Sequence, residues 1–95
     1  MRKRQILAVE DEGVIALDIA AKLHDLGYGV AAVTATGEEA IEKAEGKRPD
    51  LVLMDIHLSG TMSGTEAADV IQKRFDIPVV YLTAHCDPSK STSGN

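Results

Sequence analysis

The stretch that decides the fold is LVLMDIHLSG, residues 51–60. Four apolar residues lead directly into Asp55, and a short loop containing His57, Ser59 and Gly60 follows. An apolar run of this length is typical of a buried strand in a parallel sheet. A carboxylate at the end of such a strand costs free energy unless another group pairs with it. The sequence therefore predicts a strand that positions Asp55 for a chemical role.

Apolar segments alternate with amphipathic segments along the rest of the chain. Further strands are predicted at residues 5–9, 30–34 and 77–84, and helices are predicted over 12–26, over 36–46 and from 63 onward. The strands are apolar on both sides and the connections are short, which is typical of a parallel sheet with helices on both faces. Right-handed crossovers then favour an α/β fold built on a doubly wound parallel sheet.

The first helix is predicted from the spacing of its apolar residues. Its inner face is expected to carry four large side chains, Ile15, Ile19, Leu23 and Leu26. This spacing matches one face of an α-helix. Gly27 directly after this stripe is expected to end the helix.

The second and third helices are predicted from their first residues. Thr36 is followed three residues later by Glu39, and Ser63 by Glu66, and each pair has the pattern of a capping box. Gly46 is expected to end the second helix.

The composition excludes several classes of protein. The chain has 95 residues, enough for one small domain, which we expect over 1–86 with a flexible tail over 87–95. The net charge of −5 argues against nucleic acid as the partner, and no apolar run approaches the roughly 20 residues that cross a bilayer. Because Cys86 is the single cysteine, an internal disulfide and a cysteine-based zinc site are excluded. A cytoplasmic setting is therefore expected.

Acidic residues end two of the predicted strands. Glu10 and Asp11 follow residues 5–9, and Asp55 follows 51–54. If these strands are neighbours, about 4.8 Å apart, the three carboxylates crowd one rim, where they need either a proton or a cation. Oxygen ligands favour Mg²⁺, or Mn²⁺ in its place, and a carboxylate beside such an ion can form an aspartyl phosphate. The alternatives are that Glu10, Asp11 and Glu12 form an acidic helix start, which the helix dipole favours, and that Asp55 is a solvated strand end.

Three motifs together carry a resemblance to a known family. ILAVEDEG (6–13), LVLMDIHLSG (51–60) and VVYLTA (79–84) resemble the receiver domain of two-component response regulators. The likeness spans residues 5 to about 86, and the downstream part looks most like receivers attached to sensor histidine kinases. It implies a flavodoxin-like fold with strand order 2-1-3-4. It also implies a signalling phosphoprotein, not an enzyme with turnover, that takes a phosphoryl group from a histidine kinase or phosphotransfer protein.

The resemblance implies a role for each motif residue at the acidic rim. Asp55 is the phosphoacceptor and shares a magnesium ion with its neighbours. Asp11 binds the metal directly, and Glu10 assists through water. The main-chain carbonyl of His57 supplies a further ligand.

The end of the fourth strand has implied roles as well. The Thr83 hydroxyl bonds the phosphoryl oxygen and swings inward on activation. Ala84 stays small so that its backbone amide reaches the phosphate.

The sequence departs from the family pattern at the rim. Glu10 stands where the family usually has Asp, and Ser59 stands where Pro is common. The loop after Asp55 is one residue longer than usual before Gly64. We expect metal binding to survive with changed geometry.

A second departure lies after the fourth strand. The family's fourth helix, fifth strand and fifth helix are missing, and with them the lysine that clamps the phosphoryl group. Lys90, seven residues past Thr83, is too near to cross back as a parallel strand. We therefore expect a C-terminally truncated receiver that self-associates through the exposed strand 77–82.

Three other functions stay open at this point. A degenerate receiver would act as a docking module that does not depend on phosphorylation. A phosphatase with an aspartate nucleophile generally needs a second aspartate at the position of His57. Finally, His57 and His85 with Asp55 and Glu10 would suit a transition metal such as Zn²⁺.

Overall fold

The computed structural model describes residues 2–82. Its elements run in the order β1 (Gln5–Val9), α1 (Gly13–Asp25), β2 (Gly29–Thr34), α2 (Gly37–Lys47), β3 (Leu51–Asp55), α3 (Gly64–Phe75) and β4 (Val79–Leu82). The predicted alternation of strands and helices is confirmed. Several predicted features lie outside the described residues: Thr83, Ala84, His85, Cys86, Lys90 and the tail 87–95.

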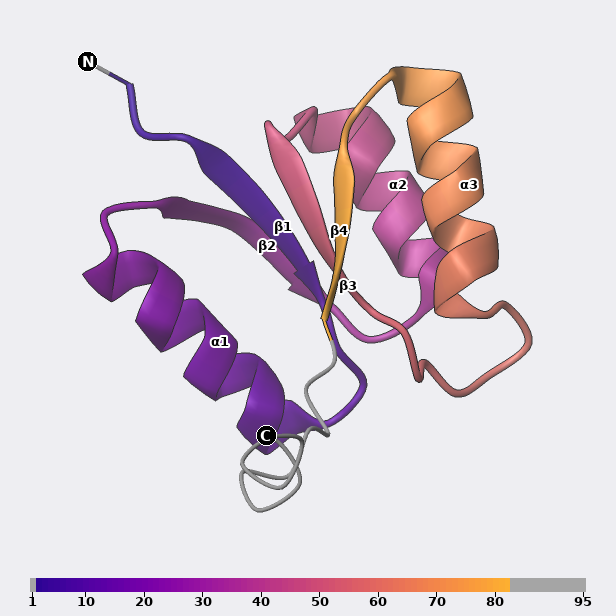
Figure 1. The fold of residues 1–95 in the computed structure, drawn as a ribbon, viewed down its shortest axis with the longest axis horizontal. Coiled ribbons are helices and arrows are strands. Elements are labelled where there is room, and N and C mark those ends of the chain that lie inside the picture. The colour runs from indigo at the N-terminus through magenta and orange to yellow at the C-terminus, as the bar shows by residue number, and fades with distance from the viewer. Residues whose placement is uncertain (1, 83–95) are drawn as a thin grey trace, which may run out of the picture.

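The four strands form one parallel sheet. Their order is β2-β1-β3-β4, so β1 and β3 are the two inner strands (Figure 1). The predicted order 2-1-3-4 is confirmed. Since every strand runs the same way, the carboxyl ends of β1 and β3 meet at one rim.

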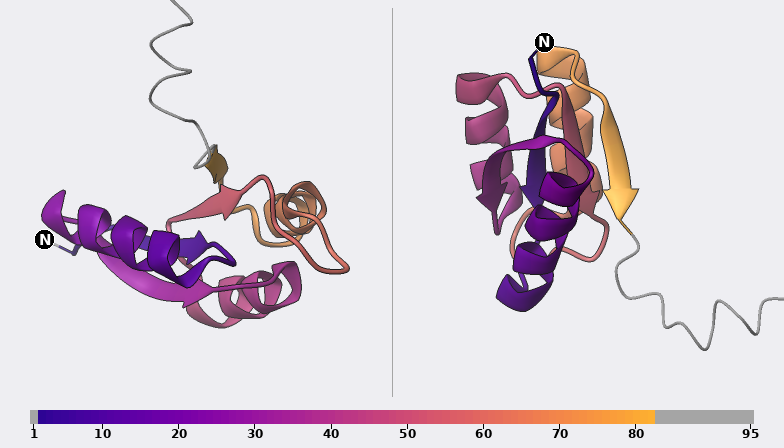
Figure 2. Two further views of the ribbon diagram at one scale, coloured as in Figure 1. Left: turned by 90° about the horizontal axis from the view of Figure 1, so that it is seen from below. Right: turned by 90° about the vertical axis from the view of Figure 1, so that its left-hand side faces the viewer.

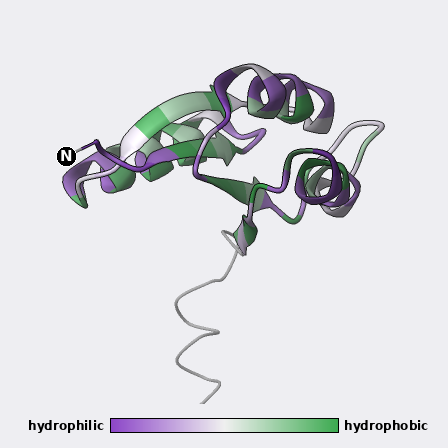
Figure 3. Cartoon of the chain, turned by 90° about the horizontal axis from the view of Figure 1, so that it is seen from above, coloured by the Kyte–Doolittle hydropathy of each residue, from purple (hydrophilic) through white to green (hydrophobic). Residues whose placement is uncertain are grey.

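Helices cover both faces of the sheet. Helices α2 and α3 pack against each other on one face, and α1 lies on the other (Figures 1 and 2). β3 and β4 are largely hydrophobic, whereas the helices mix hydrophobic and hydrophilic residues, as Figure 3 shows. The main core lies between the sheet and the α2/α3 layer and includes Leu7, Val9, Val52, Met54, Ala40, Ala44, Ala67 and Ile71. The core therefore holds β1 and β3 rigidly beneath the rim.

The face covered by α1 is less closely packed than predicted. Leu23 and Ala16 are buried, but Leu26, expected on the inner face, is 73% exposed. The prediction for Leu26 was wrong because the helix ends at Asp25, and Gly27 at φ +92° turns the chain away. Gly27 thus ends the helix as expected. Because the last helical residue is Asp25, Leu26 does not join the buried face of the helix.

The two predicted capping boxes are borne out to different degrees. Ser63 and Glu66 form both reciprocal bonds at the start of α3. The Thr36 hydroxyl accepts the Glu39 N–H, while the Glu39 carboxylate accepts the N–H of Ala35 instead. These bonds satisfy N–H groups that have no partner within the helix.

The end of α2 was predicted incorrectly. Gly46 does not end the helix, which continues to Lys47, and Arg48 adopts the left-handed conformation at φ 47°. Its N–H donates to the Ala44 carbonyl, and its guanidinium lies 5.0 Å from the centre of the Phe75 ring. These contacts offset the cost of a left-handed non-glycine residue.

No helix within residues 2–82 is long and apolar enough to cross a lipid bilayer.

Candidate phosphoacceptor and cation site

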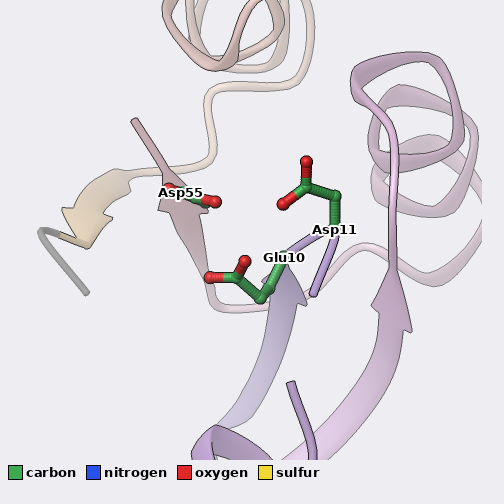
Figure 4. Close-up of side chains that lie close together, drawn as sticks. All are labelled: Glu10, Asp11 and Asp55. Atoms are coloured by element: carbon green, nitrogen blue, oxygen red, sulfur yellow. The ribbon is translucent and has the colours of Figure 1, made fainter. Parts of the chain in front are cut away.

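Strand pairing brings the predicted acids together at the rim. Val9 pairs with Met54, so the next residues, Glu10 and Asp55, leave neighbouring strands at the same level. Figure 4 shows the side chains of Glu10, Asp11 and Asp55 turned toward a common space. Each offers a carboxylate oxygen, and these oxygens all lie within 4.8 Å of one another. The geometry that the sequence predicted for the three carboxylates is confirmed.

Two of the three carboxylates are buried. Glu10 is 2% exposed and Asp55 is fully buried. Oε1 of Glu10 and Oδ2 of Asp55 have no hydrogen-bond partner among the described residues. Buried oxygens without a partner are costly, especially when the carboxyl groups are ionised. Such oxygens, converging from two strands, suit a hard divalent cation.

Each carboxylate of the cluster has one oxygen held by another part of the chain. The Glu12 N–H donates to Oε2 of Glu10 (3.2 Å), and the His57 N–H donates to Oδ1 of Asp55 (2.8 Å). In the loop after β3, the Ser59 N–H and hydroxyl donate to Oδ2 of Asp11. The other oxygen of each group accepts none of these bonds, so one oxygen per residue is left for a ligand.

The electrostatics of the cluster follow from its burial. Burial raises the pKa of Glu10 to about 7, opposed by the bond from the Glu12 N–H and reinforced by the neighbouring Asp55 carboxylate. The pKa of Asp11 is lowered, first by the Ser59 hydroxyl and then by the Ser59 amide. Near neutral pH, a cation bound at this cluster would therefore have to compete with a proton for the Glu10 carboxylate.

The remaining predicted site residues have different outcomes. The backbone N–H of His57 bonds Asp55, while its carbonyl as a metal ligand stays a prediction. Among the side chains of residues 2–82, the group that could hold a metal consists of the three carboxylates, and the His57 imidazole is not part of it. Thr83, Ala84 and His85 lie outside the described residues, so their roles stay predictions.

Ser59 is the site residue whose contact the sequence did not reveal. Its hydroxyl and its amide both donate to Oδ2 of Asp11, at 2.5 and 3.2 Å. The two residues are 48 positions apart, and no local pattern signals a contact across that separation. The only sign in the sequence was that Ser59 replaces a residue common in the family.

Gly64 also shapes the rim. A Cβ at this position would collide with the carbonyl oxygen of Asp55. The absence of a side chain lets the first turn of α3 approach the end of β3 directly. Gly64 thereby fixes the path by which the chain leaves Asp55.

The comparison with protein families decides the assignment. A model of the response regulator receiver domain matches residues 6–93. The chain belongs to the response regulator receiver family. Among the relatives of this receiver, the phyllosphere-induced regulator PhyR of Methylorubrum extorquens is 43% identical over 82 residues, which cover 85% of this chain and 31% of PhyR.

Solved structures agree with the receiver fold. The signal receiver domain of a modulated diguanylate cyclase from Desulfovibrio desulfuricans G20 has a TM-score of 0.83 and 33% identity, covering 95% of this chain and 72% of that one. The anti-anti-sigma factor PhyR of Bartonella quintana, solved in complex with the anti-sigma factor NepR, has a TM-score of 0.79 and 36% identity, covering 86% and 34%. This receiver thus spans about a third of the length of each PhyR protein.

Proposed function

We propose that this receiver accepts a phosphoryl group on Asp55 in two-component signalling. The single observation that carries the proposal is the buried Oδ2 of Asp55, which has no hydrogen-bond partner among residues 2–82, in a carboxylate that lies beside those of Glu10 and Asp11. The donor in this proposal is the phosphohistidine of a histidine kinase or phosphotransfer protein. The receiver is then a signalling module whose only chemistry is its own phosphorylation and dephosphorylation.

The proposed transfer uses the two oxygens of Asp55 differently. Oδ1 stays bonded to the His57 N–H, which fixes the plane of the carboxylate. Oδ2 attacks phosphorus, the new O–P bond forms while the P–N bond to the donor imidazole breaks, and the imidazole keeps the electron pair. A strand end held by a packed core keeps the attacking atom in place, which favours such a transfer.

The proposed cation is Mg²⁺, with Mn²⁺ as a substitute. Glu10, Asp11 and Asp55 would hold it, together with water and, by family resemblance, the His57 carbonyl. When bound, the ion supplies positive charge that offsets the repulsion between carboxylate and phosphoryl oxygens. In the same proposal Thr83 bonds the phosphoryl group and the Ala84 amide approaches it.

The partner in this proposal is another protein in the cytoplasm, and neither nucleic acid nor a membrane.

A second candidate function is docking that does not depend on phosphorylation. The solved complex of PhyR from Bartonella quintana with the anti-sigma factor NepR supports a protein as the partner. Binding of the partner by Asp55→Asn as tightly as by the unmodified protein would support docking over phosphotransfer.

Self-association through β4 is part of the proposal as well. Within residues 2–82, β4 pairs only with β3, and Val80 and Tyr81 are partly exposed on it. A strand with free N–H and C=O groups along one side can pair with a second copy.

Phosphorylation by a small donor tests the main proposal. The protein is incubated with acetyl phosphate or phosphoramidate and Mg²⁺, and its intact mass is measured. One added phosphoryl group, lost in Asp55→Asn and in EDTA, is the expected result. No mass change under any condition, or equal labelling of Asp55→Asn, would overturn the proposal.

A further inference from the structure

We propose that Ser59 is a positioning residue of the cation site, acting through Asp11. This inference rests on the proposed function, since it concerns the same divalent cation. The relationship it depends on is the pair of bonds from the Ser59 hydroxyl and amide to Oδ2 of Asp11. Asp11 is the most exposed carboxylate of the cluster, whereas Glu10 and Asp55 are buried. Its orientation therefore depends on bonds from neighbouring groups.

Both Ser59 donors bond the same oxygen atom. Oδ2 receives the hydroxyl at 2.5 Å and the amide at 3.2 Å, so Oδ1 remains for the cation. In Figure 4 the two oxygens of Asp11 point in different directions, one toward Asp55 and Glu10 and one away. A carboxylate that is held at one oxygen presents the other in a fixed direction, and such supporting bonds strengthen metal sites.

The identity of residue 59 decides whether this support exists. Proline, the residue common at this position in the family, has neither an N–H nor a hydroxyl and would remove both bonds. Serine supplies both. The two substitutions at the rim relative to the family pattern, Glu10 and Ser59, therefore lie in one neighbourhood, because the longer Glu10 side chain lies beside the carboxylate that Ser59 holds.

Ser59 also connects the cation site to the loop after β3. This loop has a second attachment, in which the Thr61 hydroxyl donates to Oε2 of Glu38 at 2.8 Å. The Thr61 bond reaches the start of α2 and does not touch the acidic cluster. It provides a matched control, since both are hydroxyl-to-carboxylate bonds made from the same loop.

A graded series of variants tests the role of Ser59. Mg²⁺ and Mn²⁺ affinities are measured by calorimetry for the unmodified protein, Ser59→Thr, Ser59→Ala, Ser59→Pro and Thr61→Ala. Loss of an outer partner of a metal ligand typically weakens binding, and we expect about a tenfold loss for Ser59→Ala, the low end of the usual range. Ser59→Pro should lose more, whereas Ser59→Thr and Thr61→Ala should bind as the unmodified protein does.

Melting temperatures in EDTA separate positioning from folding. Ser59→Ala and Thr61→Ala should melt alike without metal, and only Ser59→Ala should lose part of the increase that Mg²⁺ gives. Equal or tighter Mg²⁺ binding by Ser59→Ala would overturn this inference while leaving the proposed function intact. Failure of the unmodified protein to bind either cation would overturn both. If Ser59→Pro does not fold, the comparison of Ser59→Ala with Thr61→Ala still decides.

Discussion

Glu10 and Asp55 end neighbouring strands in the same way. In each, one carboxylate oxygen accepts the backbone N–H of the residue two positions ahead, Glu12 and His57 respectively. In each, the other oxygen is buried and has no partner among residues 2–82. Two strand ends with one local geometry thus bring two such oxygens to one rim, and the proposed cation site rests on this arrangement.

Asp55→Asn is expected to remove phosphorylation and to stabilise the metal-free protein. The new amide keeps an oxygen for the His57 N–H and can donate to Oε1 of Glu10, which has no partner within the described part of the chain. Removing one of the crowded buried charges should raise the free energy of unfolding by about 1 kcal/mol. Thermal unfolding in EDTA measures this, and a lower melting temperature than that of the unmodified protein would contradict it.

The metal-free protein is expected to lose stability as the pH rises from about 4.5 to 7. Glu10 has a folded-state pKa of about 7 against an ordinary value of 4.5, so the folded state binds more protons across this range. Its contribution, about 3 kcal/mol, is complete below the lower value and is lost as the pH rises through the higher one. Melting curves in EDTA at several pH values check this.

The control for this pH dependence is Glu10→Gln. It should flatten the melting temperature between pH 4.5 and 7 and weaken Mg²⁺ binding. Asp11 has a lowered pKa, so its contribution is present above pH 3.8 and is lost only at more acid pH. A slope of unchanged size in Glu10→Gln would show that another group causes it.

The parallel sheet could be predicted from the sequence for a physical reason. Apolar runs, cap residues and crossover handedness act locally or follow general rules, so they predict a doubly wound sheet without any knowledge of contacts. The placement of β1 beside β3 came from the resemblance to the receiver family. Once those strands are parallel neighbours, the positions of Glu10 and Asp55 follow from their places at the strand ends.

The errors arose where distant contacts decide the structure. Arg48 takes a left-handed conformation because its backbone and guanidinium find partners in α2 and at Phe75, and glycine at position 46 is not needed. The contact of Ser59 with Asp11 joins two loops whose conformations no periodic pattern describes. Both depend on packing that exists only in the folded chain.

Gly64→Ala is expected to destabilise the protein, and Gly46→Ala to stabilise it. A Cβ at Gly64 meets the Asp55 carbonyl oxygen, a backbone atom that cannot turn aside, which should cost about 2–3 kcal/mol. Gly46 lies in α2, and a Cβ at this position would meet no neighbouring side chain or other segment within 4 Å. Alanine there should add about 0.5–1 kcal/mol through its helix propensity. Urea unfolding of both variants checks the pair, and similar changes in both would contradict the role of Gly64.

Val80→Lys is expected to reduce self-association. Val80 is 47% exposed on β4, and a charged side chain there opposes pairing of this edge with a second copy. The matched control is Val33→Lys on β2, at the opposite edge of the sheet, where valine is 44% exposed. Sedimentation velocity over a range of concentrations should show that the unmodified protein and Val33→Lys associate while Val80→Lys stays monomeric. A monomer in all three proteins would rule out the association, and equal association in all three would place the interface away from β4.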